Sequence, residues 1–208
     1  AAVKSCAADR GDASIAFDEL GDNLEHLDDL GERRIAFMDA QGVDLQILAL
    51  APPGTHPLDP VAAVALSRRA NDTAADAVSR HPTRFRALAT LPMADPVAAV
   101  AELERAASIG FVGAMVYGRT GDTPLDDRRY DGVFAAAAAL GRPIFIHPQI
   151  PSQTTREAAV GGVEPSSNRG RATFGWGWHL EAALSALRLI VSGVFDRHPD
   201  LQLVLGHW

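Results

Sequence analysis

Short apolar runs alternate with helical patterns along most of the chain. Five runs are apolar without a strict two-residue alternation, which is typical of strands buried on both faces of a parallel sheet. They are "DLQILAL" (44–50), "FRALATLP" (85–92), "FVGAMVYG" (111–118), "PIFIHP" (143–148) and "LQLVLGH" (201–207). Residues 1–25 are polar and interrupted by glycine instead, so we expect an irregular N-terminal segment there.

Helices are predicted between these strands. They are Asp28–Gln41, a helix that begins after Asp59-Pro60, one that begins at Asp95-Pro96, 126–141 and about Trp178–Arg197. Strands that are each separated by a helix indicate an α/β fold with a parallel sheet. Right-handed crossovers place the carboxyl ends of such strands on one face, where ligands bind.

The two ends of this pattern suggest a partial fold. Trp208 directly follows the apolar run 201–207, and the first predicted element is a helix rather than a strand. An apolar strand without a covering helix is a poor terminus, and a complete (β/α)8 TIM-type barrel needs about 250 residues. We therefore expect 26–208 to form an incomplete barrel, a fragment of a larger protein.

Two predicted strands end on histidine. His147 closes the run at 143–148, and His207 closes the run at 201–207. Since the carboxyl ends of parallel strands share one face, both imidazoles are candidates to bind a divalent metal or to transfer protons. The alternative is that each ring only bonds to a nearby backbone group. The predicted strand ends carry no Asp or Glu, so a metal with three or four ligands needs residues from elsewhere.

The other five histidines give weaker signals. His81 and His198 occur in "RHP" at helix ends, where a cation favours the negative end of the helix dipole. His26 and His56 lie in loops or at helix starts, and a structural role suffices for both. His179 begins the helix that follows a long insertion, so it could line the pocket.

The insertion at about 149–177 is longer than an ordinary connection of roughly 2 to 6 residues, and long loops at the ligand face usually serve the site. Trp176 is our predicted substrate-binding aromatic wall, and Trp178 could stack in the same way. Three arginines could meet a substrate carboxylate: Arg156, Arg169 and Arg171. The alternative is that the tryptophans only pack the loop against the barrel.

The composition limits the classes of binding partner and function that we expect. The formal charge of −7 disfavours nucleic acids and anionic membranes, so a small molecule is the expected partner. Cys6 is the single cysteine, which excludes an intrachain disulfide and favours a cytoplasmic location. No phosphate-binding loop, dinucleotide-binding glycine motif or serine nucleophile elbow occurs. Nucleotide-binding and serine hydrolase functions therefore lose their main support.

Several segments together carry a family resemblance. They are "ERRIAFMDAQGVDLQILAL", "RRANDTAADAVSRHPTRFRALATLPMADP", "IGFVGAMVYG", "PIFIHPQIP" and "LRLIVSGVFDRHPDLQLVLGH". In this order they resemble the amidohydrolase-related metal-dependent decarboxylases, the family that includes the γ-resorcylate decarboxylases. The resemblance runs from about Asp28 to Trp208. It implies a distorted (β/α)8 barrel, with the five predicted strands as numbers two to six.

The resemblance also implies roles for the two histidines. His147 matches the metal ligand on the fifth strand, and His207 matches the sixth-strand histidine that lies beside the metal and handles protons. The family's ligand pair on the first strand and its aspartate on the eighth have no counterpart in the chain. Ser185 stands where some relatives carry histidine. We therefore expect one divalent metal, zinc or manganese, in the complete protein and weak or no binding by this chain.

The implied activity is non-oxidative decarboxylation of a small aromatic or enol-type carboxylic acid, hydroxybenzoate-like, by a protein that is a homo-oligomer (dimer or tetramer) when complete. Two alternatives stay open. One is metal-dependent hydrolysis of a lactone, ester or amide at the same site. The other is a non-catalytic fragment that only binds partners.

Overall fold

The chain divides into two units after Met115, inside strand β3 (Gly113–Tyr117). The computed structural model describes residues 27–162 and 170–207. The predicted irregular segment at 1–25 therefore lies outside the described residues. None of the described helices is long and apolar enough to cross a membrane.

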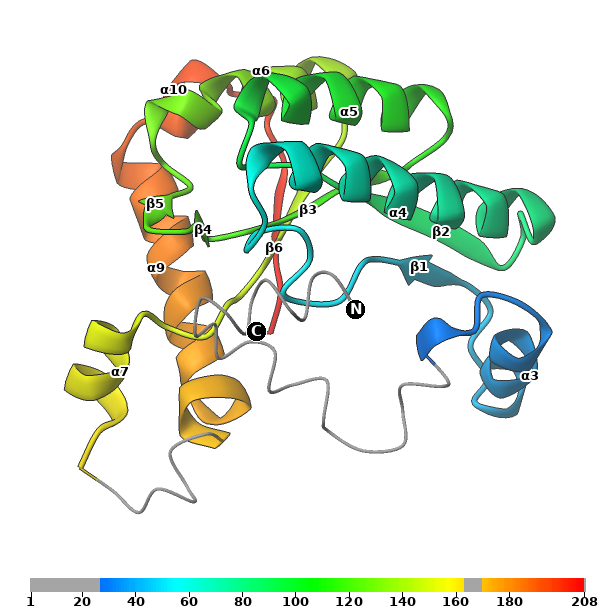
Figure 1. Cartoon of the computed structure of the whole chain (residues 1–208), viewed down its shortest axis with the longest axis horizontal. Coiled ribbons are helices and arrows are strands. Elements are labelled where there is room, and N and C mark those ends of the chain that lie inside the picture. Colours follow the sequence, from blue (N-terminus) through cyan, green and yellow to red (C-terminus); the bar gives the residue numbers. More distant parts are fainter. Residues whose placement is uncertain (1–26, 163–169, 208) are drawn as a thin grey trace. The chain divides into compact units, whose positions relative to one another are not determined.

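The first unit consists of parallel strands and the helices that connect them. Its strands are β1 (Gln46–Leu48), β2 (Phe85–Thr90) and the start of β3, and its helices are α3 (Glu32–Ala40), α4 (Pro60–Arg80) and α5 (Pro96–Ser108) (Figure 1). β1 pairs in parallel with β2, and β2 pairs in parallel with β3. The core includes Phe85, Met38 and Leu103, which are almost fully buried.

The predicted starts of two helices are confirmed in this unit. The side chain of Asp59 accepts a hydrogen bond from the Ala62 amide (3.0 Å), and Pro60 is the first helical residue. Asp95 accepts from the amides of Val97 and Ala98 in the same way. A carboxylate at this position satisfies backbone amides that the first helical turn leaves without a partner.

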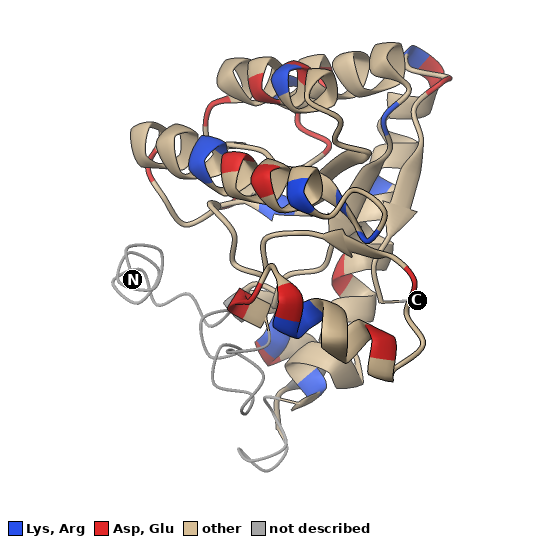
Figure 2. Cartoon of the chain, turned by 90° about the vertical axis from the view of Figure 1, so that its right-hand side faces the viewer, with Lys and Arg blue, Asp and Glu red and all other residues tan. Residues whose placement is uncertain are grey.

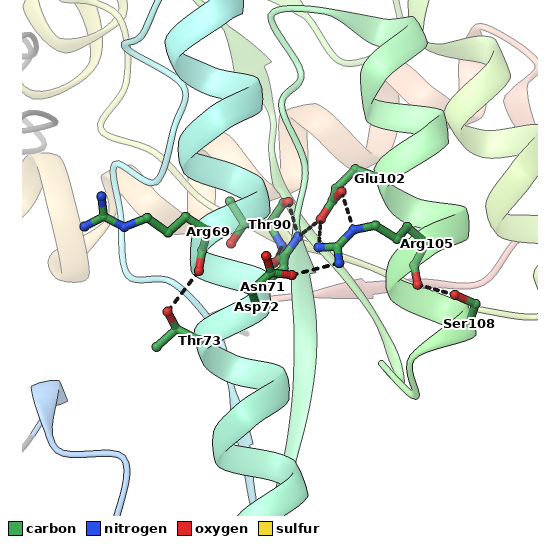
Figure 3. Close-up of polar contacts among 8 residues, drawn as sticks. All are labelled: Arg69, Asn71, Asp72, Thr73, Thr90, Glu102, Arg105 and Ser108. Atoms are coloured by element: carbon green, nitrogen blue, oxygen red, sulfur yellow. Dashed lines mark hydrogen bonds and ion pairs between the residues drawn. The ribbon is translucent and has the colours of Figure 1, made fainter.

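A buried polar network fixes both of these helices to the end of β2 (Figure 3). The Asn71 amide donates to the Thr90 carbonyl (3.0 Å), and its oxygen accepts from the Thr90 amide (2.8 Å). The same amide donates to Glu102 on α5 (2.7 Å), and Arg105 donates to that carboxylate twice. Arg105 also donates to Asp72 (2.8 Å). The three packed elements are thus joined by polar groups that satisfy one another.

The second unit begins with a small hairpin and contains the remaining elements. They are β4 (Arg119–Thr120), β5 (Thr123–Pro124), η2 (Arg128–Tyr130), α6 (Asp131–Leu140), β6 (Ile144–His147), α7 (Gln153–Val160), η3 (Arg171–Gly175), α9 (Gly177–Val191), α10 (Val194–Arg197) and β7 (Leu203–Leu205). β6 pairs in parallel with β7, with Ile144 opposite Leu203 and Ile146 opposite Leu205. The parallel strands and connecting helices confirm the predicted α/β class and all five predicted strands.

Some predicted boundaries were wrong. The helix predicted from Trp178 to Arg197 is two helices, because Gly193 takes a left-handed conformation (φ 72°) that ends α9 and starts α10. The helix predicted from Asp28 begins only at Glu32, since the Asp29 side chain accepts from the Gly31 amide (2.8 Å) and stabilises a turn there. The insertion contains α7, capped by Ser152, which we had not predicted.

Charged side chains of both signs are interspersed along the described helices (Figure 2). Ion pairs join many of them, such as Arg80 with Asp76 and Arg188 with Asp126. Residues of both charge signs therefore occur along the same helices (Figure 2).

Candidate functional site

His147 is the last residue of β6, and its ring is held in a defined orientation. Ile144 and Ile146 alternate with it along the strand and are fully buried, whereas His147 is partly buried. Its Nδ1 lies 2.7 Å from the carbonyl oxygen of Pro148. A carbonyl only accepts, so Nδ1 carries the hydrogen that is donated, and the Nε2 of the neutral ring is the acceptor nitrogen, which receives the Nε2–H of His207. That is the arrangement of a ring prepared to bind a metal or accept a proton.

His207 follows β7 and meets His147 directly. The two Nε2 atoms lie 3.3 Å apart, and the ring centroids are separated by 5.0 Å. The amide of Gly206 donates to the carbonyl of Ile146 (3.0 Å), which continues the β6–β7 pairing up to the pair. His207 itself has a φ of 60°, a conformation uncommon outside glycine. The sequence-predicted partners are therefore brought together, by strand pairing and by a special backbone conformation.

Both imidazoles are electrostatically biased toward the neutral form. Burial lowers the pKa of His147 below its ordinary 6.5, the bond to Pro148 opposes this change, and the nearby His207 adds to it. Burial also lowers the pKa of His207, and His179 lowers it further. Neutral rings retain the lone pairs that metal binding and proton abstraction require.

Aromatic rings surround the histidine pair. Tyr117 at the end of β3 lies edge-on to His147, with centroids 5.9 Å apart. Trp178 in the first turn of α9 contacts both histidines, at 6.1 Å from His147 and 4.6 Å from His207. The pair thus has an apolar wall on which a planar substrate could stack.

Trp176, the predicted aromatic wall, lies elsewhere in this group of rings. It stacks on His179 with centroids 6.4 Å apart and an interplanar angle of 13°, and 55% of its surface is exposed. Trp176 precedes the first residue of α9, whereas Trp178 lies inside its first turn. The sequence does carry a signal for Trp178 that our prediction did not use. The helical spacing of Trp178, Glu181 and Ser185 puts these three residues on one face of the helix.

The α9 face that carries these residues packs closely against the exit of β3. A Cβ added at Gly118 would lie only 2.1 Å from the Ser185 hydroxyl oxygen, so the backbone passes directly beside that side chain. Glu181, one turn earlier, is 8% exposed, and burial raises its pKa while Arg119 opposes the change. Neither Arg119 nor Glu181 was predicted as a site residue, because charged residues in a hairpin and a helix usually face solvent.

The remaining candidates from the sequence have mostly structural surroundings. His81 and His198 occupy helix C-caps as predicted, and His198 also pairs with Asp131 (3.2 Å). His56 is 9% exposed in the first unit. His26 and Arg169 lie outside the described residues.

The donor set for a metal is partial. Among the residues that the structure describes, no three histidine, cysteine or carboxylate side chains gather closely enough to hold an ion. His147 and the adjacent His207 could supply part of a metal site, since neutral imidazole is a common ligand for zinc and other transition metals, but further ligands are required.

Comparisons with known proteins identify the family to which this chain is related. The family model described as "Amidohydrolase" matches residues 18–208. A γ-resorcylate decarboxylase from Rhizobium radiobacter is 37% identical over 196 residues, covering 88% of this chain and 57% of the relative. The resemblance inferred from the sequence is therefore confirmed. The chain spans 55–59% of the length of five curated relatives that it matches at 36–37% identity.

Solved structures support the same fold. A 5-carboxyvanillate decarboxylase from Novosphingobium aromaticivorans, with bound manganese and 3-methoxy-4-hydroxy-5-nitrobenzoic acid, matches with a TM-score of 0.87 at 35% identity. The match covers 99% of this chain and 61% of that chain, which fits the predicted incomplete barrel. A dihydroxybenzoic acid decarboxylase from Polaromonas sp. JS666, with manganese and 2-nitroresorcinol, matches at 0.75 and 36%, covering 86% and 55%.

Proposed function

The chain belongs to the amidohydrolase family, and we propose that the whole protein is a divalent-metal-dependent, non-oxidative decarboxylase of a small hydroxybenzoate-like carboxylic acid. The observation that carries this proposal is the contact of His147 with His207, 3.3 Å between Nε2 atoms, beside the ring of Trp178. The decarboxylases similar to this chain act on planar aromatic acids by name, and such a ring pocket suits that shape.

His147 is the proposed metal ligand. Its Nδ1–H bond to Pro148 leaves Nε2 available to an ion, and the manganese in two similar structures favours manganese over zinc. A divalent metal, when bound, orients and polarises the substrate's oxygen atoms. The other ligands would come from outside the described residues, and weak or no metal binding by residues 1–208 alone stays our prediction.

His207 is the proposed proton-handling residue. Its Nε2 faces His147, and its lowered pKa keeps the ring neutral near pH 7, so it can take a proton from solvent and pass it to the substrate carbon as the bond to the departing carbon dioxide breaks. Trp178 is the proposed aromatic wall, because it contacts both histidines. Trp176, favoured by the sequence, is the second candidate for that wall.

The direct test is decarboxylation by the whole protein supplied with manganese or zinc. We expect carbon dioxide release from 2,6-dihydroxybenzoate or a related hydroxybenzoate, and loss of that release when the metal is chelated. A His198→Asn variant, altered outside the pair, serves as the control. Failure to release carbon dioxide from a broad panel of aromatic acids would contradict the proposal.

A metal-dependent hydrolase is the second candidate, which the family's description as an amidohydrolase favours. A metal-bound water with a pKa of about 7 could attack a lactone, ester or amide at the same histidines. Hydrolysis of a lactone panel without carbon dioxide release would favour it. A protein that binds no metal and shows neither activity would favour the non-catalytic alternative.

Two further predictions concern the whole protein. We propose a homo-oligomer, dimer or tetramer, with a small-molecule substrate and neither nucleic acid nor membrane as partner, on the basis of the family resemblance and the acidic composition. Sedimentation velocity tests the assembly.

A cytoplasmic location is proposed from the single cysteine, and fractionation of cells that express the protein tests it.

A further inference from the structure

The segment that follows β6 controls the ring of His147. The carbonyl of Pro148 receives the Nδ1–H of His147, and this bond decides which nitrogen keeps its lone pair. Two residues later, Ile150 is 7% exposed, and its carbonyl oxygen accepts a hydrogen bond from Arg119 (2.7 Å). The direction of the Pro148 carbonyl therefore depends on a short backbone segment with a side-chain anchor at its far end.

Arg119 supplies that anchor from β4, 31 residues earlier in the chain. One guanidinium nitrogen donates to Ile150, and another donates to the Gly121 carbonyl of its own hairpin (3.1 Å). The Nε atom is buried without a hydrogen-bond partner in the described part of the chain. A planar guanidinium held at two carbonyls has little freedom to turn, so the distance between hairpin and segment is fixed.

Glu181 lies on the face of α9 that packs beside the start of the Arg119 hairpin. Glu181 is 8% exposed, burial raises the pKa of its carboxyl, and attraction to Arg119 opposes that change. Glu181 follows Trp178 by three positions and precedes Ser185 by four, so it shares their helix face. Ser185 on that face lies directly against Gly118, the residue before Arg119. The close packing of α9 therefore reaches the hairpin residue next to Arg119.

We propose that Arg119 is a positioning residue that fixes the 148–150 segment and thereby the ring orientation and tautomer of His147. The inference rests on the proposed role of His147 as a metal ligand. It assigns Arg119 no contact with substrate. The path runs from the guanidinium to the Ile150 carbonyl, along the backbone to the Pro148 carbonyl, and from there to the Nδ1–H of His147.

The test compares Arg119→Met with Arg119→Lys in the whole protein. Long-range ¹H–¹⁵N spectra of the metal-free protein report the His147 tautomer, and titration with manganese alone reports affinity. We expect Arg119→Met to lose the single Nδ1–H tautomer and to weaken manganese binding about 10- to 100-fold, the usual effect of removing an outer-shell partner. Arg119→Lys should restore much of both, since an ammonium can still donate to Ile150.

Arg197→Met is the matched control, because Arg197 also donates to two backbone carbonyls in the second unit, those of Ser192 and Gly193. It should leave the His147 signals unchanged.

Should Arg119→Met fold poorly, the double variant Arg119→Met/Glu181→Leu also removes the buried carboxylate of Glu181 and is measured in the same way. A folded variant that lacks Arg119 but keeps the unaltered tautomer and manganese affinity would overturn the inference. Absence of decarboxylation by the unaltered protein would instead contradict the proposed function, and the tautomer comparison would still stand.

Discussion

The two units handle their buried polar groups in opposite ways. In the first unit, Asn71 satisfies both backbone groups of Thr90 and one carboxylate oxygen of Glu102, and Arg105 completes that carboxylate's partners. In the second unit, His147 donates from one nitrogen to the Pro148 carbonyl, and its other nitrogen meets another titratable ring, that of His207. The first arrangement joins groups that have fixed donor and acceptor roles, whereas the second joins two rings that can exchange a proton or a partner.

The arrangement in the first unit favours stability of the fold, and the arrangement in the second unit favours chemical reactivity. A saturated network in a low-dielectric interior gains from every bond and loses heavily when one member is removed. An imidazole pair with lowered pKa values and a free lone pair gains less stability, but it can bind an ion or a proton. We therefore expect substitutions in the first unit to reduce the free energy of unfolding, and substitutions at the pair to reduce activity.

The largest effect is expected from His147→Ala. Loss of the proposed metal ligand should lower decarboxylation by the whole protein at least about 1,000-fold, equivalent to about 4 kcal/mol in the transition-state barrier. Manganese content after dialysis and the rate of carbon dioxide release measure it. The melting temperature should change little, since His147 makes one backbone bond. Full activity in this variant would contradict the assignment of the pair.

Asn71→Ala is expected to reduce the stability of the fold rather than the activity. It leaves the Thr90 amide and carbonyl and the Glu102 carboxylate without their common partner, at a cost of about 3 kcal/mol in the free energy of unfolding. Urea denaturation measures this loss. Thr73→Ala is the control on the same helix, because its exposed hydroxyl donates to the Arg69 carbonyl of the same helix, and we expect less than about 0.5 kcal/mol.

The two tryptophans offer a matched pair. Trp178→Leu should raise the KM for an aromatic acid and lower kcat/KM about 10-fold, since Trp178 contacts both histidines and stacking contributes about 1 kcal/mol. Trp176→Leu should change kcat/KM by less than about twofold, because its ring stacks on His179 and is largely exposed. If Trp176→Leu lowered kcat/KM more than Trp178→Leu, Trp176 would be the better candidate for the aromatic wall of the substrate site.

The smallest expected effect is a dependence of stability on pH. His147 and His207 have pKa values below the ordinary 6.5, so between pH 6.5 and their lowered values the unfolded chain binds more protons than the folded one. Stability should be complete well above pH 6.5 and should fall as the pH drops through 6.5. Urea midpoints at pH 7.5 and 5.5 measure the loss, and a His147→Asn/His207→Asn variant should show a smaller one. An equal loss in that variant would locate the titrating groups elsewhere.

Much of the fold could be predicted from the sequence because it depends on local rules. The five apolar runs are strands, and Asp59 and Asp95 cap their helices as the Asp-Pro pairs indicate. The break at Gly193 was missed, because a glycine inside a helical pattern is often tolerated. The β4–β5 hairpin was missed as well, since two-residue strands carry too few positions to show a period.

The site was only partly predictable for a related reason. His147 and His207 stood out because parallel topology alone brings strand ends together. Arg119 and Glu181 gave no signal, since the sequence does not show the hydrogen bond of Arg119 to Ile150 or the burial of the α9 face that carries Glu181. The choice between Trp176 and Trp178 depended on where α9 begins, and helix boundaries are uncertain by one or two residues.

The contact between Gly118 and Ser185 has a consequence for sequence variation. A Cβ at position 118 and the hydroxyl at position 185 compete for one small volume, so the two positions cannot enlarge independently. Gly118→Ala should be harmful alone and tolerated together with Ser185→Gly, and such a compensating pair should produce covariation of the two positions among relatives. Because this shared volume lies on the α9 face that also carries Trp178, evolution or a mutant library could shift the aromatic wall there while both histidines stay in place.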